Sequence, residues 1–276
     1  MSLIIDKWYH AGHQYWCSMK MTTDKFVFQI NRKAKSDLSF QQACDQAALD
    51  IAQTWSHKPL FIALSGGLDS ELTAKTFLRN KIDFTPFILE IGQINQIETW
   101  YAHRWCFENN IKPVIYSMSL QELVTDVIPL LQFLPYTNQT GTIINLWLAQ
   151  YIAKQGGHCI LAVGDINWDD DQKVFYNNIV DWAVDMTWPD QHPCGFLSYS
   201  PELVLSYIKQ FDETLNEQYN KLNFYQLSPR PKINYLEKMF SSHPVIKQAI
   251  HRHSIQNPPA AQHTFGSKQQ LISLLS

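Results

Sequence analysis

LFIALSGGLDS, at residues 60–70, begins with an apolar run that is typical of a buried strand. The run ends at Ser-Gly-Gly (65–67), and Asp69 and Ser70 then open a helical pattern. Glycines let the backbone approach an anion closely, and a helix N-terminus adds N–H groups and positive potential. A strand, a glycine-rich turn and a helix in this order therefore predict a phosphate-binding loop.

The side chains around the two glycines favour the same interpretation. The hydroxyls of Ser65 and Ser70 can donate further hydrogen bonds to an anion. Asp69 cannot favourably face a bare phosphate, so its natural role is to hold a magnesium ion that bridges it. The alternative is a tight strand-to-helix turn with an Asx cap and no ligand. Two flanking hydroxyls and an Asp-Ser pair in the first helical turn favour phosphate binding.

This run resembles the SGGxDS signature of the PP-loop ATP pyrophosphatases, the adenine-nucleotide alpha-hydrolase family. These enzymes split ATP between its α and β phosphates, form an adenylated intermediate and release pyrophosphate. A Walker P-loop is excluded because the chain lacks the Gly-Lys-Ser/Thr ending. Among the branches of the family, Leu-Ser-Gly-Gly-Leu-Asp-Ser looks most like the synthetase domain of asparagine synthetases and beta-lactam synthetases. The resemblance covers residues 40–170 and implies ATP and Mg²⁺ as cofactors.

Composition limits the other classes of function. The chain has 276 residues, a net charge of −3 and 17% charged residues, which does not favour nucleic-acid or anionic-membrane binding. Its 5 cysteines form no C-x-x-C pair, which argues for a reducing compartment and against a disulfide framework. Without a signal-peptide pattern or a long apolar stretch, we expect a soluble cytoplasmic protein.

Strand and helix patterns alternate along the middle of the chain. Apolar runs predict strands at 60–64, 84–91, 113–116 and 159–163, with helical patterns between them. This spacing predicts an α/β fold, a parallel doubly wound sheet of the Rossmann-like HUP type with about five strands and helices on both faces. We expect three parts: a β-hairpin and lead-in helix (1–56), the ATP-binding core (57–180), and a C-terminal lid and helical region (181–276).

The resemblance implies a set of nucleotide-binding positions. Backbone groups near Leu64 and Leu89 would hold the adenine, and Glu90 would meet the ribose or cap a helix. The full set that the resemblance implies is Leu64, Ser65, Gly66, Gly67, Asp69, Ser70, Leu89 and Gly164.

A second informative stretch, Gly164 to Asp171, follows the fourth strand. It resembles the strand-four loop of asparagine synthetases, Gly-(Asp/Glu)-Gly-x-Asp-Glu, but lacks the second glycine. The resemblance implies that Gly164 passes close to the nucleotide and that one carboxylate shares the metal with Asp69. Asp165 is the first candidate and Asp169 the second. A solvated acidic loop, or a calcium-like site without EF-hand spacing, is the alternative.

In the family, a lysine from the C-terminal helical part stabilises charge on the leaving pyrophosphate. Lys232 and Lys238 are the candidates here, and they join Asp69 as expected catalytic residues. Either lysine could equally be a solvated surface charge. Patterns beginning near Ser200 and Asp212 predict helices, whereas we expect the Gln- and Ser-rich end of the chain to be loosely held.

The leading functional prediction is an ATP-dependent ligase or amidotransferase that adenylates a small-molecule carboxylate or carbonyl oxygen. A nitrogen nucleophile would then displace AMP. About 55 residues precede the first core strand, too few for a glutaminase domain, so the nitrogen donor is expected to be ammonia, a substrate amine or a separate amidotransferase partner. Two alternatives remain: a tRNA-modifying PP-loop ATPase, and a nucleotide-binding protein without catalysis.

Overall fold

A five-stranded parallel sheet forms the centre of the molecule, with strand order β10-β7-β4-β5-β6. The structure is a computed structural model that describes residues 8–22, 25–133, 140–164, 166–178, 194–227, 242–253 and 262–276. The predicted parallel sheet of about five strands is therefore confirmed. Its strands are β4 (Leu60–Ala63), β5 (Thr85–Ile91), β6 (Val114–Met118), β7 (His158–Leu161) and the short β10 (Cys194–Gly195).

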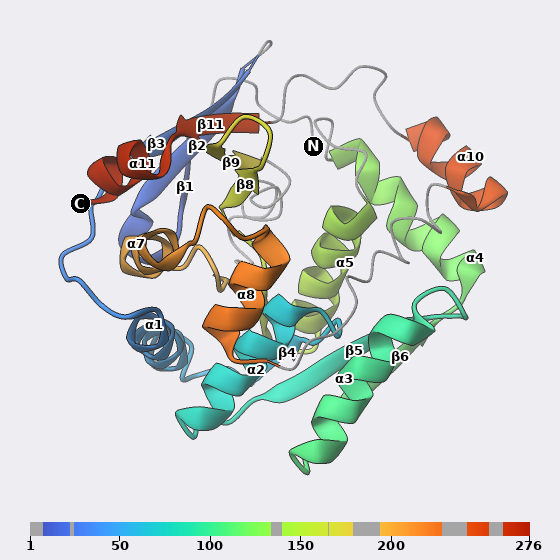
Figure 1. Cartoon of the computed structure of the whole chain (residues 1–276). Helices are drawn as coiled ribbons and strands as arrows, with labels where there is room; N and C mark the ends of the chain where they lie inside the picture. The colour runs from blue at the N-terminus through green and yellow to red at the C-terminus, as the bar shows by residue number, and fades with distance from the viewer. Residues whose placement is uncertain are drawn as a thin grey trace.

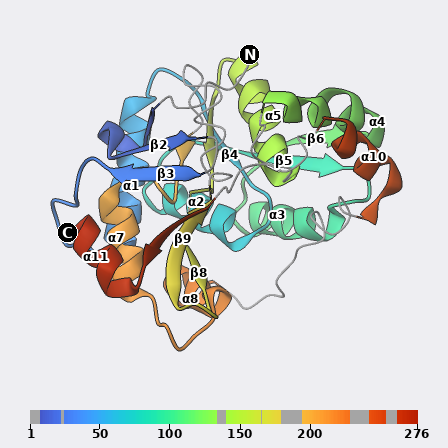
Figure 2. The ribbon, with the colours of Figure 1, turned by 90° about the horizontal axis from the view of Figure 1, so that it is seen from above.

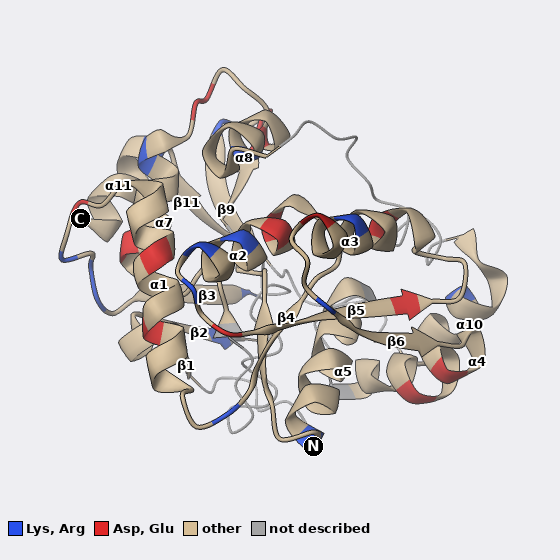
Figure 3. Cartoon of the chain, turned by 90° about the horizontal axis from the view of Figure 1, so that it is seen from below, with Lys and Arg blue, Asp and Glu red and all other residues tan. Residues whose placement is uncertain are grey.

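Helices cover both faces of this sheet, as predicted. The helices α2 (Leu68–Arg79) and α3 (Gln96–Glu108) connect β4 to β5 and β5 to β6 and lie on one face, whereas α5 (Thr140–Lys154) leads into β7 on the other face (Figure 3). The chain adds β5 and β6 on one side of β4, then returns to add β7 on the other side. This reversal makes β4 and β7 the switch point of the sheet, where ligands bind in folds of this kind.

The lead-in helix α1 (Phe40–Thr54) has Ser39 as its N-cap. Ser39 forms a capping box with Gln42, in which the serine side chain accepts a hydrogen bond from the Gln42 N–H and the glutamine side chain accepts one from Ser39. Arg79 at the end of α2 forms an ion pair with Asp45 of α1. The lead-in helix is thus fixed against the helix that follows the glycine-rich turn.

The helical run after β6 is not one regular α-helix. It begins as α4 (Leu120–Glu122), continues as the π-helical segment η2 (Leu123–Val127) and ends as the 3₁₀ segment η3 (Ile128–Phe133). Pro129 has no backbone N–H to donate to the carbonyl four residues earlier, so a regular α-helix cannot continue through it.

Two small antiparallel sheets lie beside the central one (Figures 1 and 2). The first contains β1 (Tyr9–Ala11), β2 (Cys17–Met21) and β3 (Phe26–Ile30), and it confirms the predicted N-terminal hairpin; the turn η1 (His13–Tyr15) connects its first two strands. The second contains β8 (Asn167–Asp169), β9 (Val174–Asn178) and β11 (Gln262–Gly266). The acidic stretch after the fourth strand is therefore largely a β-hairpin, not the open loop that we expected.

The C-terminal part of the chain packs back onto the rest of the molecule. Its helices are α7 (Pro201–Gln210), α8 (Glu217–Tyr225), α10 (Pro244–His253) and α11 (Lys268–Leu275). The expectation of a loosely held end is wrong for residues 262–276, because β11 pairs with β9, and Leu271 and Leu275 of α11 are buried. The second C-terminal helix begins at Glu217, later than the pattern from Asp212 suggests, because Asn216 is its N-cap. None of the helices in the described ranges combines the length and apolar content that a membrane span requires.

The turn between β4 and α2 depends on a close contact with α3. Gly66 has a φ of +88°, and a Cβ atom added there would lie 1.9 Å from the carbonyl oxygen of Glu98. Both the left-handed backbone and the missing side chain are needed for the turn to pass over the first turn of α3. Gly92 also has a positive φ, +49°, but an added Cβ would meet nothing within 4 Å.

This contrast predicts unequal costs for two alanine substitutions. Gly92→Ala imposes only backbone strain and is expected to cost about 1–2 kcal/mol of unfolding free energy. Gly66→Ala adds an overlap with the α3 backbone and is expected to cost at least about 3 kcal/mol. Urea unfolding of both variants measures the difference. Equal losses would mean that the turn does not need its contact with α3.

Candidate active site

The glycine-rich turn presents the open N-terminus of α2. Gly67 is the N-cap residue and brings no side chain to the first-turn N–H groups. The Ser65 and Ser70 hydroxyl oxygens lie 3.2 Å apart, and Ser65 Oγ accepts a hydrogen bond from the Gly67 N–H at 3.3 Å. Ser70 Oγ donates to the Gly67 carbonyl at 3.0 Å. The two hydroxyls thus hold the turn in shape while its N–H groups point along the helix axis, an arrangement that binds anions.

A cavity of about 250 Å³ opens beside this turn at the carboxyl ends of the central strands. One end of it is lined by Ser65, Gly67, Asp69 and Ser70 of the turn and first turn of α2. Its other walls are mainly apolar and come from the ends of β4, β5 and β7 and from α5; they include Leu64, Phe87, Leu89, Leu148, Leu161 and Val163. A ligand with an anionic part and a flat apolar part fits this division.

Asp69 is held by two side chains from α8, 152 and 156 residues further along the chain. Lys221 Nζ lies 3.1 Å from Asp69 Oδ2 and also 3.1 Å from Glu217 Oε1. The Tyr225 hydroxyl donates a hydrogen bond of 2.7 Å to Asp69 Oδ1. Burial, with a further contribution from the Asp69 charge, raises the pKa of Tyr225 well above its usual value, so the phenol stays protonated and remains a donor.

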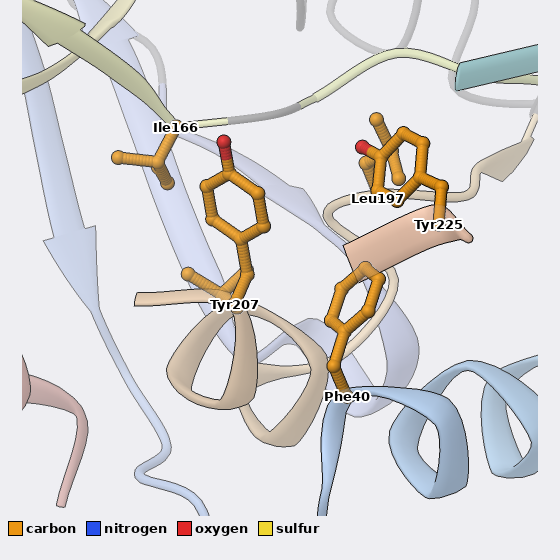
Figure 4. A pocket seen from close by; sticks show the side chains of 6 residues that line it. Phe40, Ile166, Leu197, Tyr207 and Tyr225 are labelled. Carbon is orange, nitrogen blue, oxygen red and sulfur yellow. The ribbon is translucent and has the colours of Figure 1, made fainter. Parts of the chain in front are cut away.

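Aromatic packing and a lysine of α2 hold α8 in this position. The Tyr225 ring stacks on Phe40 of α1, with ring centres 5.8 Å apart and planes 12° from parallel. Figure 4 shows Tyr225 and Phe40 beside Tyr207 around a cavity of about 10 Å³, which is no larger than a water molecule requires. Lys75 Nζ donates to the carbonyls of Tyr225 and Gln226 at 3.1 and 3.2 Å, where α8 ends. These contacts hold α8 in place, and α8 in turn positions Lys221 beside Asp69.

The cavity brings together most of the nucleotide-binding positions that the sequence suggests. Those that line it are Leu64, Ser65, Gly67, Asp69, Ser70 and Leu89. The Leu64 N–H already donates to the Phe87 carbonyl at 2.9 Å, and the Leu89 carbonyl accepts from the Asn95 side chain at 2.7 Å. Gly66 forms the turn itself through its contact with α3.

The other suggested positions lie elsewhere or outside the described residues. Gly164 has a φ of +94°, and an added Cβ would lie 2.0 Å from Ser198 Oγ, so this glycine allows close packing of that segment. Asp169 Oδ1 accepts hydrogen bonds from the N–H groups of Asp171 and Gln172 in the β8–β9 turn. Asp165, Lys232 and Lys238 lie outside the described residues. The roles expected of these five residues remain predictions.

The Glu90 carboxylate contacts side chains of α3 and β6 and not the glycine-rich turn. Its Oε1 lies 2.8 Å from His103 Nε2 of α3, and its Oε2 accepts a hydrogen bond of 3.0 Å from Ser117 of β6. These contacts give the carboxylate a role in joining α3 to the edge strand, which neither of the two alternatives for Glu90 anticipated.

Lys221 and Tyr225 were not predicted from the sequence, where the family resemblance indicates lysines only further along the chain. A signal was available, because Glu217, Lys221 and Tyr225 recur at four-residue spacing and so share one helix face. Nothing in that spacing names Asp69 as their partner, since the contact depends on how α8 packs on α2.

Solved structures with a similar arrangement include three enzymes named as NAD or NMN synthetases. An NH3-dependent NAD synthetase from Campylobacter jejuni is 16% identical over 78% of this chain and 93% of its own, with a TM-score of 0.37. The NMN synthetase from Francisella tularensis is 12% identical over 81% of this chain and 99% of its own, with a TM-score of 0.36.

The third is a glutamine-dependent NAD+ synthetase from Acinetobacter baumannii, solved in complex with ADP. It is 12% identical over 88% of this chain and 53% of its own, with a TM-score of 0.39. No family model and no curated protein matches the chain. All three TM-scores lie below 0.5, so the function of this chain does not follow from these likenesses.

The Asp69–Lys221 pair predicts a measurable coupling between α2 and α8. In a double-mutant cycle with Asp69→Asn and Lys221→Met, we expect a coupling energy of about 1–3 kcal/mol in unfolding free energy, because the lysine side chain is largely buried. The matched control is the surface pair Lys209–Asp37, with atoms 2.8 Å apart and the Asp37 side chain 73% exposed. Its coupling should stay below about 1 kcal/mol. Equal coupling in the two pairs would contradict a structural role for the buried one.

Proposed function

We propose that this chain is an ATP-dependent, adenylate-forming ligase of the PP-loop ATP pyrophosphatase class. The observation that carries the proposal is the open N-terminus of α2, which has no capping side chain at Gly67 and lies beside Ser65, Asp69 and Ser70 at the mouth of an apolar cavity. The N–H groups and hydroxyls would bind the anionic triphosphate, and the apolar walls would take the base.

Lys221 is suited to neutralise charge on the phosphates. Its ammonium group already contacts the carboxylate nearest the turn, and its side chain is only 10% exposed. A cation held in a largely buried position stabilises developing negative charge more strongly than a solvated one. We therefore assign to Lys221 the role that resemblance alone would give to Lys232 or Lys238, which stay as additional candidates.

Asp69 also fits a role in binding magnesium. Mg²⁺ in nucleotide sites is usually held by one or two carboxylates together with phosphate oxygens and water, so one carboxylate at the turn is sufficient. Within the described residues, no group of three or more His, Cys, Asp and Glu side chains gathers into a metal cage. Bound there, Mg²⁺ would offset the charge of the phosphates, with Asp165 or Asp169 as further proposed ligands.

The proposed reaction has two steps. An oxygen of a substrate carboxylate forms a bond to the α-phosphorus, the bridging P–O bond to the β-phosphate breaks, and pyrophosphate leaves. A nitrogen nucleophile then attacks the acyl carbon and loses a proton, and AMP leaves. The chain orients the triphosphate through the turn and α2, and Lys221 stabilises the leaving pyrophosphate.

Finer features of the proposal rest on the sequence resemblance. The motif favours the asparagine synthetase and beta-lactam synthetase branch, with a small carboxylate as acceptor. Ammonia, a substrate amine or a separate amidotransferase partner would supply the nitrogen. By the same resemblance, Gly164 would approach the nucleotide. The scattered cysteines without a C-x-x-C pair favour a reducing compartment, and we propose that the protein works in the cytoplasm.

Release of pyrophosphate from Mg-ATP tests this proposal. With a pool of carboxylate metabolites and ammonium, the native chain is expected to release pyrophosphate and AMP. Asp69→Ala is expected to lower this rate at least about 100-fold, because it removes the carboxylate beside the proposed phosphate site. Asp37→Ala, at an exposed aspartate distant in the sequence, is the control and should keep the native rate. Release of ADP and phosphate, or an unchanged rate in Asp69→Ala, would contradict the proposal.

A further inference from the structure

The polar side chains of the cavity divide into two groups. Ser65, Asp69 and Ser70 belong to the glycine-rich turn and the first turn of α2. Glu98 lies on the first turn of α3, whose carbonyl touches the same turn. These four side chains form the first group, at the end of the cavity where the proposed function places the triphosphate and its metal. Base recognition must therefore come from the polar groups of the remaining walls.

Two asparagines line those walls, and one of them, Asn95, already has a backbone partner for its side-chain oxygen and for its side-chain nitrogen. Asn95 Oδ1 accepts a hydrogen bond of 2.8 Å from the Ile91 N–H, and its Nδ2 donates one of 2.7 Å to the Leu89 carbonyl. Its side chain is buried, and it fixes the turn between β5 and α3. Asn95 therefore has a structural task, and each of its two polar side-chain atoms already has a backbone partner.

Asn145 is the second asparagine that lines these walls. It lies on α5, which lines the cavity with Gly141, Ile144, Asn145 and Leu148, positions that share one face of a helix. Asn145 is the polar member of this face and is only partly exposed. Among the residues that the structure describes, its side-chain carboxamide makes no hydrogen bond. A partly buried amide with no protein partner, facing an apolar slot, is a group whose hydrogen bonds a ligand can complete.

We propose that Asn145 reads the edge of the nucleotide base and selects adenine. This inference rests on the proposed function, because it needs the triphosphate at the α2 end of the cavity. A carboxamide offers a donor and an acceptor side by side, and adenine offers the complementary pair, the 6-amino donor and a neighbouring ring-nitrogen acceptor. The apolar strand ends would contact the faces of the base, and Asn145 would supply its orientation.

The proposed hydrogen bonds between Asn145 and adenine can be tested by measuring nucleotide binding alone. The probes are the Mg²⁺ complexes of α,β-methylene-ATP, which cannot be cleaved between the α and β phosphates, and of its purine analogue, which lacks the 6-amino group. For the native chain, removal of the 6-amino group should weaken binding about tenfold by calorimetry. For Asn145→Leu, which keeps the apolar volume but cannot hydrogen-bond, the two probes should bind within about twofold of each other.

A second variant tests the direction of the hydrogen bonds. Asn145→Asp keeps the size of the side chain but only accepts when ionised, so it can pair with the 6-amino group and not with the ring acceptor. It should lower affinity for the adenine probe at least about tenfold and lower affinity for the α,β-methylene analogue of GTP less, because guanine offers N–H donors on that edge. Lys154→Gln, on the exposed last turn of α5, is the control and should match the native chain.

The outcomes separate this inference from the proposed function. If the native chain prefers the adenine probe and Asn145→Leu abolishes that preference, Asn145 selects the base. If the native chain binds the probe and Asn145→Leu keeps the full preference for the 6-amino group, the assignment of Asn145 is wrong and the proposed function stands. If the native chain binds neither probe, the proposed function and this inference both fail.

Discussion

The contact between Asp69 and the α8 pair Lys221 and Tyr225 joins parts of the chain that are more than 150 residues apart. Helix α2 supplies the carboxylate and the open N–H groups, and α8 supplies the cation and the phenol. Because Phe40 of α1 stacks on Tyr225, and Tyr207 of α7 packs against Phe224, any displacement of α8 would disturb the lead-in helix as well. The site and the packing of the C-terminal helices therefore depend on one another.

Much of the fold follows from local patterns in the sequence. The apolar run at 60–64, the Ser-Gly-Gly turn and the helix opening at Asp69 are decided by neighbouring residues, and they are correct. The alternation of strands and helices fixes a parallel sheet, because right-handed connections leave few arrangements. The switch point follows from the same rule, and with it the place of the cavity. For this reason the sequence predicts the four longer strands of the central sheet, β4, β5, β6 and β7.

What the sequence did not predict depends on long-range contacts. The acidic stretch after β7 looks like a loop until β11, almost 90 residues later, pairs with β9. Phe265 of β11 packs edge-on against Phe28 of the N-terminal sheet, with ring centres 5.2 Å apart. Polar composition at the end of the chain therefore indicated exposure where packing provides a partner. Lys221 was not predicted for the same reason, because its contact with Asp69 depends on the packing of α8 against α2.

A crystal structure of the chain with Mg²⁺ and α,β-methylene-ATP tests the central claim most directly. We expect the phosphates at the N-terminus of α2, within hydrogen-bond distance of Ser65 or Ser70, with Asp69 beside the metal and the base in the apolar cavity. A nucleotide bound at another place, or with its phosphates away from α2, would show that the glycine-rich turn is not the phosphate site.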